Sequence, residues 1–502
     1  MSDEHDQLRS VIKDCVHCGF CLPACPTYQL WGEEMDSPRG RIYLANQVLD
    51  GAELTAAAAE HFDRCLGCMA CMTACPSGVQ YDQVIEAARV WTEEARSGEP
   101  VPGTGPRDAG PARGAEAEDG GLAGVDGAEG PSARAGGTTD RSISPKGGAD
   151  VKRRLRDRAV RAAIFSVFPY PRRLRALTGP LRAAQRTGLD RRLARGTLPD
   201  RVSPALGAAL RLAPPRPREA ARGVLPERVA ARGPRRAVVG MLTGCVQSVF
   251  FPQVNAATAR VLAAEGCDVI IPRGQGCCGA LSLHSGRAEE AARFARRTIA
   301  QFERAGVDAV VVNSAGCGSA MKEYERLLAG LPEPDPTFAL AGQEESVSWV
   351  ARAGALSGKV RDLAEFLAEL GPAAPRHPLP VTAAYHDACH LAHAQRITRQ
   401  PRELLSAIPS LRVVELPDAG MCCGSAGVYN LLQPGAAREL GRRKADAVLA
   451  TGARLVISAN PGCTLQITAE LGRRGESIAA VHTAEILDAS IRGLPAGSLG
   501  VR

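Results

Sequence analysis

Residues 15–26 read CVHCGFCLPACP, and residues 65–76 read CLGCMACMTACP. In both stretches three cysteines recur at every third residue, a fourth stands four residues further on, and a proline follows it. This spacing lets a short loop wrap one face of a cubane cluster and present three thiolates to three irons. We therefore expect a mainly α-helical domain at residues 1–95 that holds two [4Fe–4S] clusters.

The fourth cysteine of each run has a predicted partner in the other run. In two-cluster ferredoxins, whose spacing these runs share, the fourth cysteine serves the other cluster. By that rule the first cluster is held by Cys15, Cys18, Cys21 and Cys75, and the second by Cys65, Cys68, Cys71 and Cys25. Zinc bound by C-x2-C pairs is the alternative. Zinc would not explain why a third cysteine and a proline recur in both runs.

Cysteine is concentrated in two regions of the 502-residue chain. Eight of the 17 cysteines lie between Cys15 and Cys75, and the other nine follow residue 240. A chain of this length needs no disulfides to complete its core, so clustered thiols favour metal sites in a reducing compartment. We find no apolar run of about 18 residues and no apolar leader segment, which predicts a cytoplasmic protein.

The middle of the chain divides into two segments by composition. Residues 101–150 contain 13 Gly, nine Ala and five Pro, so we expect a flexible linker at 96–150. Residues 151–236 hold 23 Lys and Arg against five Asp and Glu, a net +18, which leaves 7 − 18 = −11 for the rest. We interpret 151–235 as an Arg-rich connecting segment, either a solvated face or a peripheral contact with the cytoplasmic face of the membrane. Nucleic acid is not an expected partner, because the arginines lack interleaved aromatic residues.

The C-terminal half is an internal repeat marked by cysteines. Cys245, Cys277, Cys278 and Cys317 recur as Cys389, Cys422, Cys423 and Cys463, at offsets of 144 to 146 residues. Short apolar strands alternate with amphipathic helices in both copies, which predicts an α/β fold with a parallel sheet in each. We place the first module at residues 236–375 and the second at 376–502. Both contain the sequence C-C-G, and we call them CCG modules.

In each module every cysteine follows the end of a predicted strand by a few residues. Ligands bind at that edge of a parallel sheet, so the four thiols of a module should converge there. Gly279 and Gly424 permit the sharp turn that would bring adjacent thiols together. The converged thiols could bind a cluster or zinc, or undergo redox chemistry; small buried residues at crowded loop ends are the alternative.

The remaining cysteine and the histidines beside Cys389 are interpreted separately. Cys267 lies outside both sets, at the expected end of a helix, and is interpreted as packing. His386 and His390 flank Cys389 and could share a helical face as metal ligands. The alternative for each is a polar residue at a strand end or at an exposed surface position.

Several longer segments resemble one family of redox proteins. They are residues 14–44, 63–81, 255–266, 276–284, 314–324 and 421–431. The chain resembles the iron–sulfur subunits of flavin-dependent dehydrogenases of small hydroxy acids, with glycolate oxidase the nearest. The resemblance implies an electron-transfer subunit of an oxidoreductase complex that converts glycolate to glyoxylate and is not active alone. FAD or FMN would then be bound by flavoprotein partner subunits, and the electrons would pass to a quinone or another acceptor.

The resemblance leaves other functions open. Lactate or glycerol 3-phosphate could be the donor, and a heterodisulfide-reductase-like thiol or quinone reductase could have its own active site in the CCG modules. The wider C-C-G pattern often ends in C-x-x-C, but Ala320 and Gln466 stand where the last cysteine would be. A third cluster is therefore not predicted.

Overall fold

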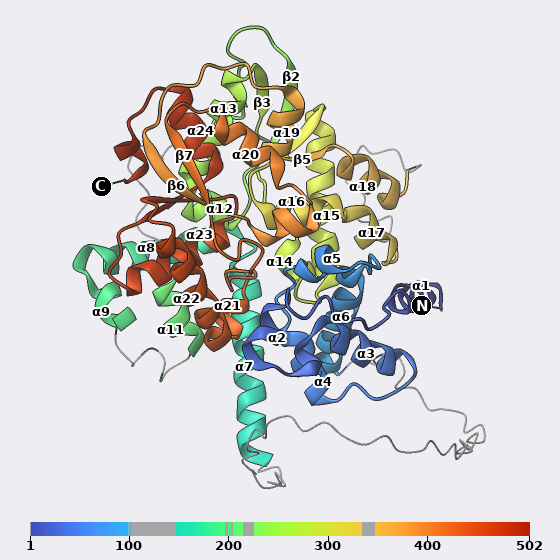
Figure 1. Cartoon of the computed structure of the whole chain (residues 1–502). Coiled ribbons are helices and arrows are strands. Elements are labelled where there is room, and N and C mark those ends of the chain that lie inside the picture. Colours follow the sequence, from blue (N-terminus) through green and yellow to red (C-terminus); the bar gives the residue numbers. More distant parts are fainter. Residues whose placement is uncertain are drawn as a thin grey trace, which may run out of the picture.

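The computed structural model describes residues 2–98, 101, 147–195, 199, 201, 204–213, 225–333 and 347–501 (Figure 1). Most of the predicted linker at 96–150 lies outside these residues. The N-terminal domain, the connecting helices and the two CCG modules follow one another along the chain.

The N-terminal domain is helical, as predicted. Its elements are α1 (Ser2–Lys13), α2 (Pro26–Trp31), η1 (Glu34–Asp36), α3 (Pro38–Leu49), α4 (Ala56–Arg64), α5 (Ala70–Ala74) and α6 (Tyr81–Ser97). Phe62, Val84, Ile85 and Ala88 form the centre of its core. Ser37 caps α3 by accepting a hydrogen bond from the Gly40 N–H, so the helix starts directly after η1.

The first CCG module contains a five-stranded sheet in the order β1-β3-β2-β4-β5. Its strands are β1 (Arg228–Val229), β2 (Ala237–Leu242), β3 (Cys267–Ile270), β4 (Ala309–Val312) and β5 (Val360–Asp362). All pairs are parallel except β1–β3. Cys267 therefore begins a strand and does not end a helix as predicted, although it is fully buried. The sheet starts at Arg228, within the segment predicted to be a connection.

The second CCG module repeats this arrangement in a parallel sheet of order β7-β6-β8-β9. Its strands are β6 (Val381–His386), β7 (Leu411–Glu415), β8 (Leu455–Ser458) and β9 (Ala479–Val481). In both modules the first long strand lies between the next two, so the thiols that follow these three strands reach one edge of the sheet.

Helices cover both sheets and join the modules. They are α12 (Val246–Phe250), α13 (Pro252–Ala264), α14 (Ala280–Leu283), α15 (Ala288–Ala305), α16 (Ala315–Lys322), α17 (Tyr324–Ala329), α18 (Trp349–Ser357), α19 (Leu363–Leu370), η4 (His390–Ala394), α20 (Arg399–Ser406), α21 (Tyr429–Leu432), α22 (Pro434–Ala450), α23 (Pro461–Arg473), α24 (Thr483–Ile491) and η5 (Ala496–Leu499). Helix α13 packs against α24, where Arg260 forms an ion pair with Asp488 at 2.6 Å.

The two modules also meet through equivalent positions. Ser314 and Asn460 are related by the repeat offset of 146 residues, and the Ser314 Oγ lies 3.4 Å from the Asn460 Oδ1. One apolar core contains residues of both sheets, such as Val239 and Tyr385. The modules therefore share one core.

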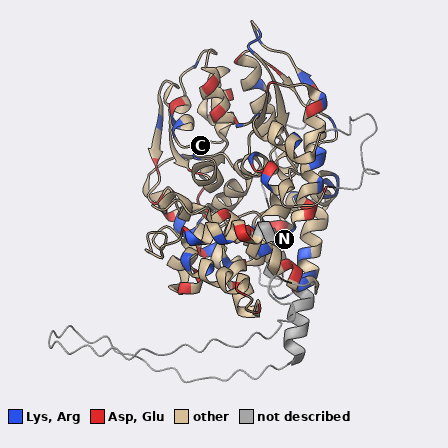
Figure 2. Cartoon of the chain, turned by 90° about the vertical axis from the view of Figure 1, so that its right-hand side faces the viewer, with Lys and Arg blue, Asp and Glu red and all other residues tan. Residues whose placement is uncertain are grey.

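The Arg-rich segment forms α7 (Gly147–Val167), α8 (Pro171–Thr187), α9 (Leu189–Arg195) and α11 (Pro204–Arg211). Helix α7 ends just before the prolines at positions 169 and 171, as predicted. Helices α8 and α11 pack beside α12 and α21 (Figure 1). In the view of Figure 2 basic and acidic residues are interspersed over the face shown. None of the described helices is long and apolar enough to cross a membrane.

Candidate functional site

The two N-terminal cysteine loops repeat one backbone conformation. His17 and Gly67 occupy the same position of the motif, with φ of 53° and 60°. Gly19 and Met69 do so two residues later, with φ of 84° and 61°. Left-handed residues at matching places give both loops the same sharp turns. The equal spacing of the cysteines therefore corresponds to equal geometry.

The structure brings the fourth cysteine of each run to the other loop. The charges of Cys75 and Cys18 act on the thiol of Cys15, and the cysteines 15, 18, 21, 71 and 75 line one small cavity. The charges of Cys68, Cys65 and Cys25 act on the thiol of Cys71. The crossover assignment of ligands stays a prediction, because Cys71 lines the cavity of the first group as well.

The two groups differ in their distance from solvent. In the first, Cys18 is exposed and Cys15, Cys21 and Cys75 are half-buried, whereas Cys25, Cys65, Cys68 and Cys71 are all buried. Beside Cys18, the side chains of Val16 and Phe20 are 68% and 67% exposed. The first group therefore lies at the surface and the second inside.

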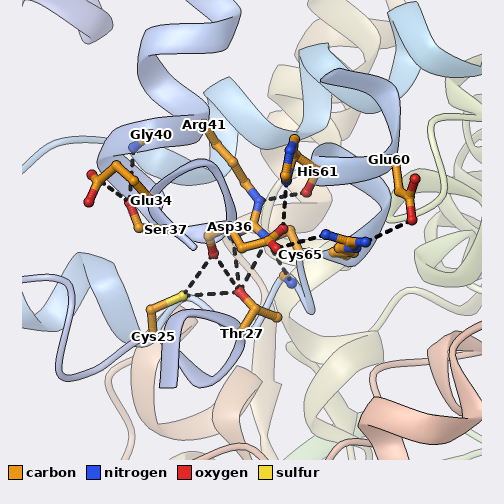
Figure 3. A network of polar contacts seen from close by, with 12 residues as sticks. Cys25, Thr27, Glu34, Asp36, Ser37, Gly40, Arg41, Glu60, His61 and Cys65 are labelled. Carbon is orange, nitrogen blue, oxygen red and sulfur yellow. Dashed lines mark hydrogen bonds and ion pairs between the residues drawn. The ribbon is translucent and has the colours of Figure 1, made fainter. Parts of the chain in front are cut away.

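A buried polar network lies beside Cys25 and Cys65 of the second group (Figure 3). The carboxylate of Asp36 accepts hydrogen bonds from Arg41 and Arg64 and contacts the His61 Nδ1 at 2.9 Å. The Asp36 carbonyl oxygen accepts from the Thr27 hydroxyl at 2.7 Å and lies 3.6 Å from the Cys25 Sγ. Asp36 thus orients the segment that carries Cys25.

Two buried cations act on Cys65. Burial raises the pKa of this thiol, but the charges of Arg41 and Arg89, together with hydrogen bonds from the Gly67 N–H and the Tyr81 hydroxyl, leave the pKa below its ordinary value. The N–H of Gly67 also donates to the Cys65 Sγ at 3.4 Å. A thiolate is stabilised here, which suits a cysteine that ligates a metal. The role of these two arginines beside Cys65 was not predicted from the sequence.

The four thiols of the first CCG module converge as predicted. The Cys245 Sγ lies 3.8 Å from the Cys277 Sγ, and Cys278 bridges Cys277 and Cys317. Hydrogen bonds from Cys245 and Cys278 hold the pKa of Cys277 well below its ordinary value. Gly279 has a φ of +92° and its N–H donates to the Cys277 Sγ at 3.3 Å.

The four thiols of the second module follow one another in the same way as those of the first. They also reach the N-terminal domain. Cys389 contacts Cys422, Cys422 contacts Cys423, and Cys423 contacts Cys463. Cys68 belongs to the same buried cluster as Cys389 and Cys422, and after burial the neighbouring Cys389 contributes most to raising the pKa of Cys68. The second ferredoxin-type group therefore adjoins the second module.

His386 distinguishes the second module from the first. A ring nitrogen of His386 and the Sγ atoms of Cys423 and Cys463 lie within 4.8 Å of one another. Burial and, to a smaller extent, the charge of Lys444 lower the pKa of His386 to about 3, so the imidazole is neutral and able to ligate a metal. His386 ends β6, so the strand-end alternative describes it and the helical face shared with His390 does not.

The residues in place of a final cysteine are not ligands. Gln466 donates through its amide to the Ala437 carbonyl at 2.8 Å and accepts from Asn430 at 3.3 Å. Ala320 is buried and apolar. Each module therefore offers four thiols, with His386 added in the second.

The thiols of both modules line one large cavity of about 530 Å³. Its other walls come from α8, α11 and α21, and from the loop that carries Cys65. At one side His284 contacts Glu86 of the N-terminal domain, with 3.7 Å between the Nδ1 and the Oε1. Arg326 holds the same carboxylate at 2.9 Å. The cavity thus lies where the N-terminal domain meets both modules.

Three family models match the chain. A 4Fe-4S dicluster domain matches residues 11–79, and a cysteine-rich domain matches residues 239–322 and again 383–468. The linker region of the glycolate oxidase iron–sulfur subunit matches residues 156–213. These matches define an iron–sulfur protein with two cysteine-rich domains.

Named relatives narrow this class. The chain is 32% identical to a probable glycolate oxidase iron–sulfur subunit of Bacillus subtilis over 94% of its length and 93% of the relative. It is 32% identical to the glycolate oxidase iron–sulfur subunit of Escherichia coli over 92% of its length and 91% of the relative. The chain belongs to the family of glycolate oxidase iron–sulfur subunits. It is also 30% identical to lactate utilization protein A of Shouchella clausii, over 50% of the chain and 98% of that relative.

Proposed function

We propose that this chain transfers electrons from flavoprotein subunits, which oxidise glycolate to glyoxylate, to a quinone or another acceptor. The observation that carries the proposal is the position of Cys68 beside Cys389 and Cys422. Iron–sulfur clusters transfer electrons singly, and Cys68, Cys389 and Cys422 are all buried, so a cluster held by Cys68 would lie next to the thiols of the second CCG module.

Two [4Fe–4S] clusters are the proposed cofactors. Cys15, Cys18, Cys21 and Cys75 would hold the first, and Cys65, Cys68, Cys71 and Cys25 the second. The donor set fits such clusters, because each group is made only of sulfur and cations lie beside the second group. When bound, the clusters supply single-electron transfer. The chain's own contribution is to place one site at the surface and the other against the CCG modules.

The flavoprotein partners would dock at the surface of the first group. Val16 and Phe20 expose apolar side chains around Cys18, and exposed apolar residues grouped at a site commonly mark an interface. FAD or FMN would then be bound by the partner subunits. Electrons would enter at the exposed group and leave from the interior.

The CCG thiols are proposed as a redox or metal site, with different ligands in the two modules. The first module offers Cys245, Cys277, Cys278 and Cys317 alone. The second offers Cys389, Cys422, Cys423 and Cys463 together with the neutral imidazole of His386. Burying several thiolates requires a compensating cation, which a metal or cluster supplies.

Lactate is the second candidate donor. The similarity to lactate utilization protein A supports it, although that relative matches only half of the chain. The donor would bind to a partner subunit in either case, so the choice depends on which flavoprotein associates with the chain.

The test is to mix the anaerobically purified chain with its flavoprotein partners and add glycolate or lactate. We expect about eight irons per chain from the two ferredoxin-type sites, and bleaching of the cluster absorbance only when partner and donor are both present. Substantial zinc with little iron would contradict the clusters. Glycolate-dependent dye reduction by the chain alone would instead favour an active site in its own CCG modules.

A further inference from the structure

The second CCG module contains a buried lysine without a carboxylate partner. Lys444 lies on α22 and is only 2% exposed. Its ammonium donates a hydrogen bond to the backbone carbonyl of Asp418 at 2.9 Å and forms no ion pair with a carboxylate of the described residues. A buried ammonium is costly unless negative charge lies close to it. A group other than a carboxylate must therefore balance this charge.

The thiols of the second module are the groups beside this ammonium. Burial lowers the pKa of Lys444, and the charges of Cys423, Cys422 and Cys463 act in the opposite direction. Lys444 in turn contributes to lowering the pKa of His386, and a ring nitrogen of His386 lies within 4.8 Å of the Cys423 and Cys463 Sγ atoms. Lys444 and His386 therefore adjoin the same thiols.

The first module has an apolar residue at the equivalent position. Lys444 corresponds to Ile299, and Cys423 corresponds to Cys278, both at the repeat offset of 145 residues. Ile299 and Cys278 belong to one buried apolar cluster. The repeat thus places this position near the C-C-G thiols in both modules, but only the second module has a cation there.

We propose that Lys444 is a positioning residue whose positive charge balances the metal–thiolate centre of the second CCG module. The inference rests on the metal site proposed for the CCG thiols and adds the residue that distinguishes the two modules. Four thiolates carry more negative charge than one divalent metal ion neutralises, and the neutral imidazole of His386 does not change this sum. The second module, which adjoins Cys68, is therefore the one suited to the more negatively charged centre.

The test loads the anaerobically purified full chain with Zn²⁺ and dialyses it against graded concentrations of EDTA. Zinc, together with iron above the roughly eight atoms of the ferredoxin-type sites, measures the metal of the CCG modules. Cys423→Ser, which lacks a thiol of the second module, identifies the share of metal that this module holds. Lys444→Met should release that share at EDTA concentrations about 10- to 100-fold lower than the parent chain, as loss of a group beside metal ligands commonly does. Lys444→Arg keeps the charge and should retain more metal than Lys444→Met.

Two matched controls separate the charge at this position from other effects. Ile299→Met introduces the same side chain at the equivalent position of the first module. Lys359→Met removes another lysine that donates to a backbone carbonyl, that of Val307 at 3.0 Å, but that is exposed. Both variants should release metal like the parent chain.

Melting temperatures distinguish charge balance from packing. In the chain whose CCG metal has been removed, Lys444 is a buried charge without a balancing anion. Lys444→Met should therefore melt at the same temperature as the parent or higher when this metal is absent, because it removes that charge. With Zn²⁺ bound, the same variant should melt below the parent. A lysine that only packs would lower the melting temperature in both states.

Two results would overturn the inference: equal metal release by Lys444→Met and the parent, or an equal fall in melting temperature with and without Zn²⁺. A parent chain that binds no metal beyond about eight irons would refute the proposed metal site of the CCG modules, and this inference with it. If Lys444→Met releases metal like the parent while the parent accepts electrons from the flavoprotein partners, the role of Lys444 alone is refuted.

Discussion

Arg89 donates a hydrogen bond to the backbone carbonyl of Cys65 at 2.6 Å, and its positive charge acts on the thiol of the same residue. Arg89 is only 8% exposed, so little solvent screens this charge. One side chain from α6 therefore both fixes the second cysteine loop and lowers the energy of negative charge on it.

This contact predicts the reduction potential of the second cluster. Arg89→Gln keeps an amide donor but removes the charge, which disfavours the more negative, reduced cluster. We expect the potential to fall by tens of millivolts, within the range that local charge and hydrogen bonds produce. A redox titration followed by electron paramagnetic resonance measures it.

Arg96→Gln is the matched control on the same helix. Arg96 pairs with Asp63 and Glu93 and is not among the charges that act most strongly on Cys65. Equal shifts for the two variants would show that the effect arises from net charge and not from the contact with Cys65.

The crossover of the fourth cysteines predicts which cluster a substitution disturbs. Cys25 follows the first run in sequence but lies with Cys65, Cys68 and Cys71. Cys25→Ser should therefore alter the spectrum of the buried cluster and leave the exposed one unchanged, while Cys75→Ser should do the reverse. Loss of the exposed cluster in Cys25→Ser would reject the assignment.

Asp362 predicts a pH dependence of stability. Burial and, to a smaller extent, the charge of Glu365 raise the pKa of this carboxyl to about 7. The folded chain thus keeps a proton that the unfolded chain releases near pH 4, so stability falls as pH rises from about 4 to about 7. Asp362→Asn removes this loss and still caps α19 by accepting from the Ala364 N–H.

Thermal melts from pH 5.5 to 8.5 test this prediction. The melting temperature of the variant relative to the parent should rise with pH and then level off, by about 1–2 °C for each kcal/mol recovered in a chain of this size. Asp446→Asn is the control: Arg474 lowers the pKa of Asp446, so its effect should not change across this range. A flat difference for Asp362→Asn would contradict the prediction.

The connecting helices predict a salt-sensitive contact with anionic membranes. The side chains of Arg153, Arg154 and Arg156 on α7 lie outside the described residues, but α8 exposes Arg172, Arg175, Arg182 and Arg186. Each basic residue near an anionic surface is worth about 1 kcal/mol. The Debye length falls from about 10 Å at 0.1 M salt to about 3 Å at 1 M, so anionic vesicles should retain the chain only at low salt.

Replacing those four α8 arginines with Gln should reduce sedimentation with vesicles at low salt while leaving the iron content unchanged. The control replaces Arg273, Arg399, Arg412 and Arg442, which are exposed elsewhere, and changes the net charge equally. If both variants sediment less by the same amount, total charge and not the α8 face governs binding.

The spacing of cysteines along the sequence predicted the individual cysteine groups. Contacts between distant parts of the chain could not be predicted in this way. The cysteine runs predicted the two N-terminal groups, and the 144- to 146-residue offsets predicted two parallel sheets with converging thiols. The proximity of Cys68 to Cys389 had no sequence signal, because it depends on how α5 packs against η4, including the 2.8 Å contact of Thr73 with His393.

Local patterns also misplaced individual residues. Cys267 was assigned to the end of a helix but begins β3. Strand β3 is only four residues long, so its first residue is hard to separate from the preceding helix by periodicity. The effect of Lys444 on the pKa of His386 was not predicted. A lysine in an amphipathic helix gives no sign in the sequence that it is buried near the thiols of the second CCG module.

The contact between Ser314 and Asn460 bears on how such a chain could have arisen. A surface on which equivalent positions face each other is self-complementary, as in a twofold-symmetric dimer. Two separate copies of an ancestral module could therefore have associated before their genes fused. After fusion the halves were free to diverge, so that one acquired a histidine and a lysine near its thiols where the other has Leu242 and Ile299.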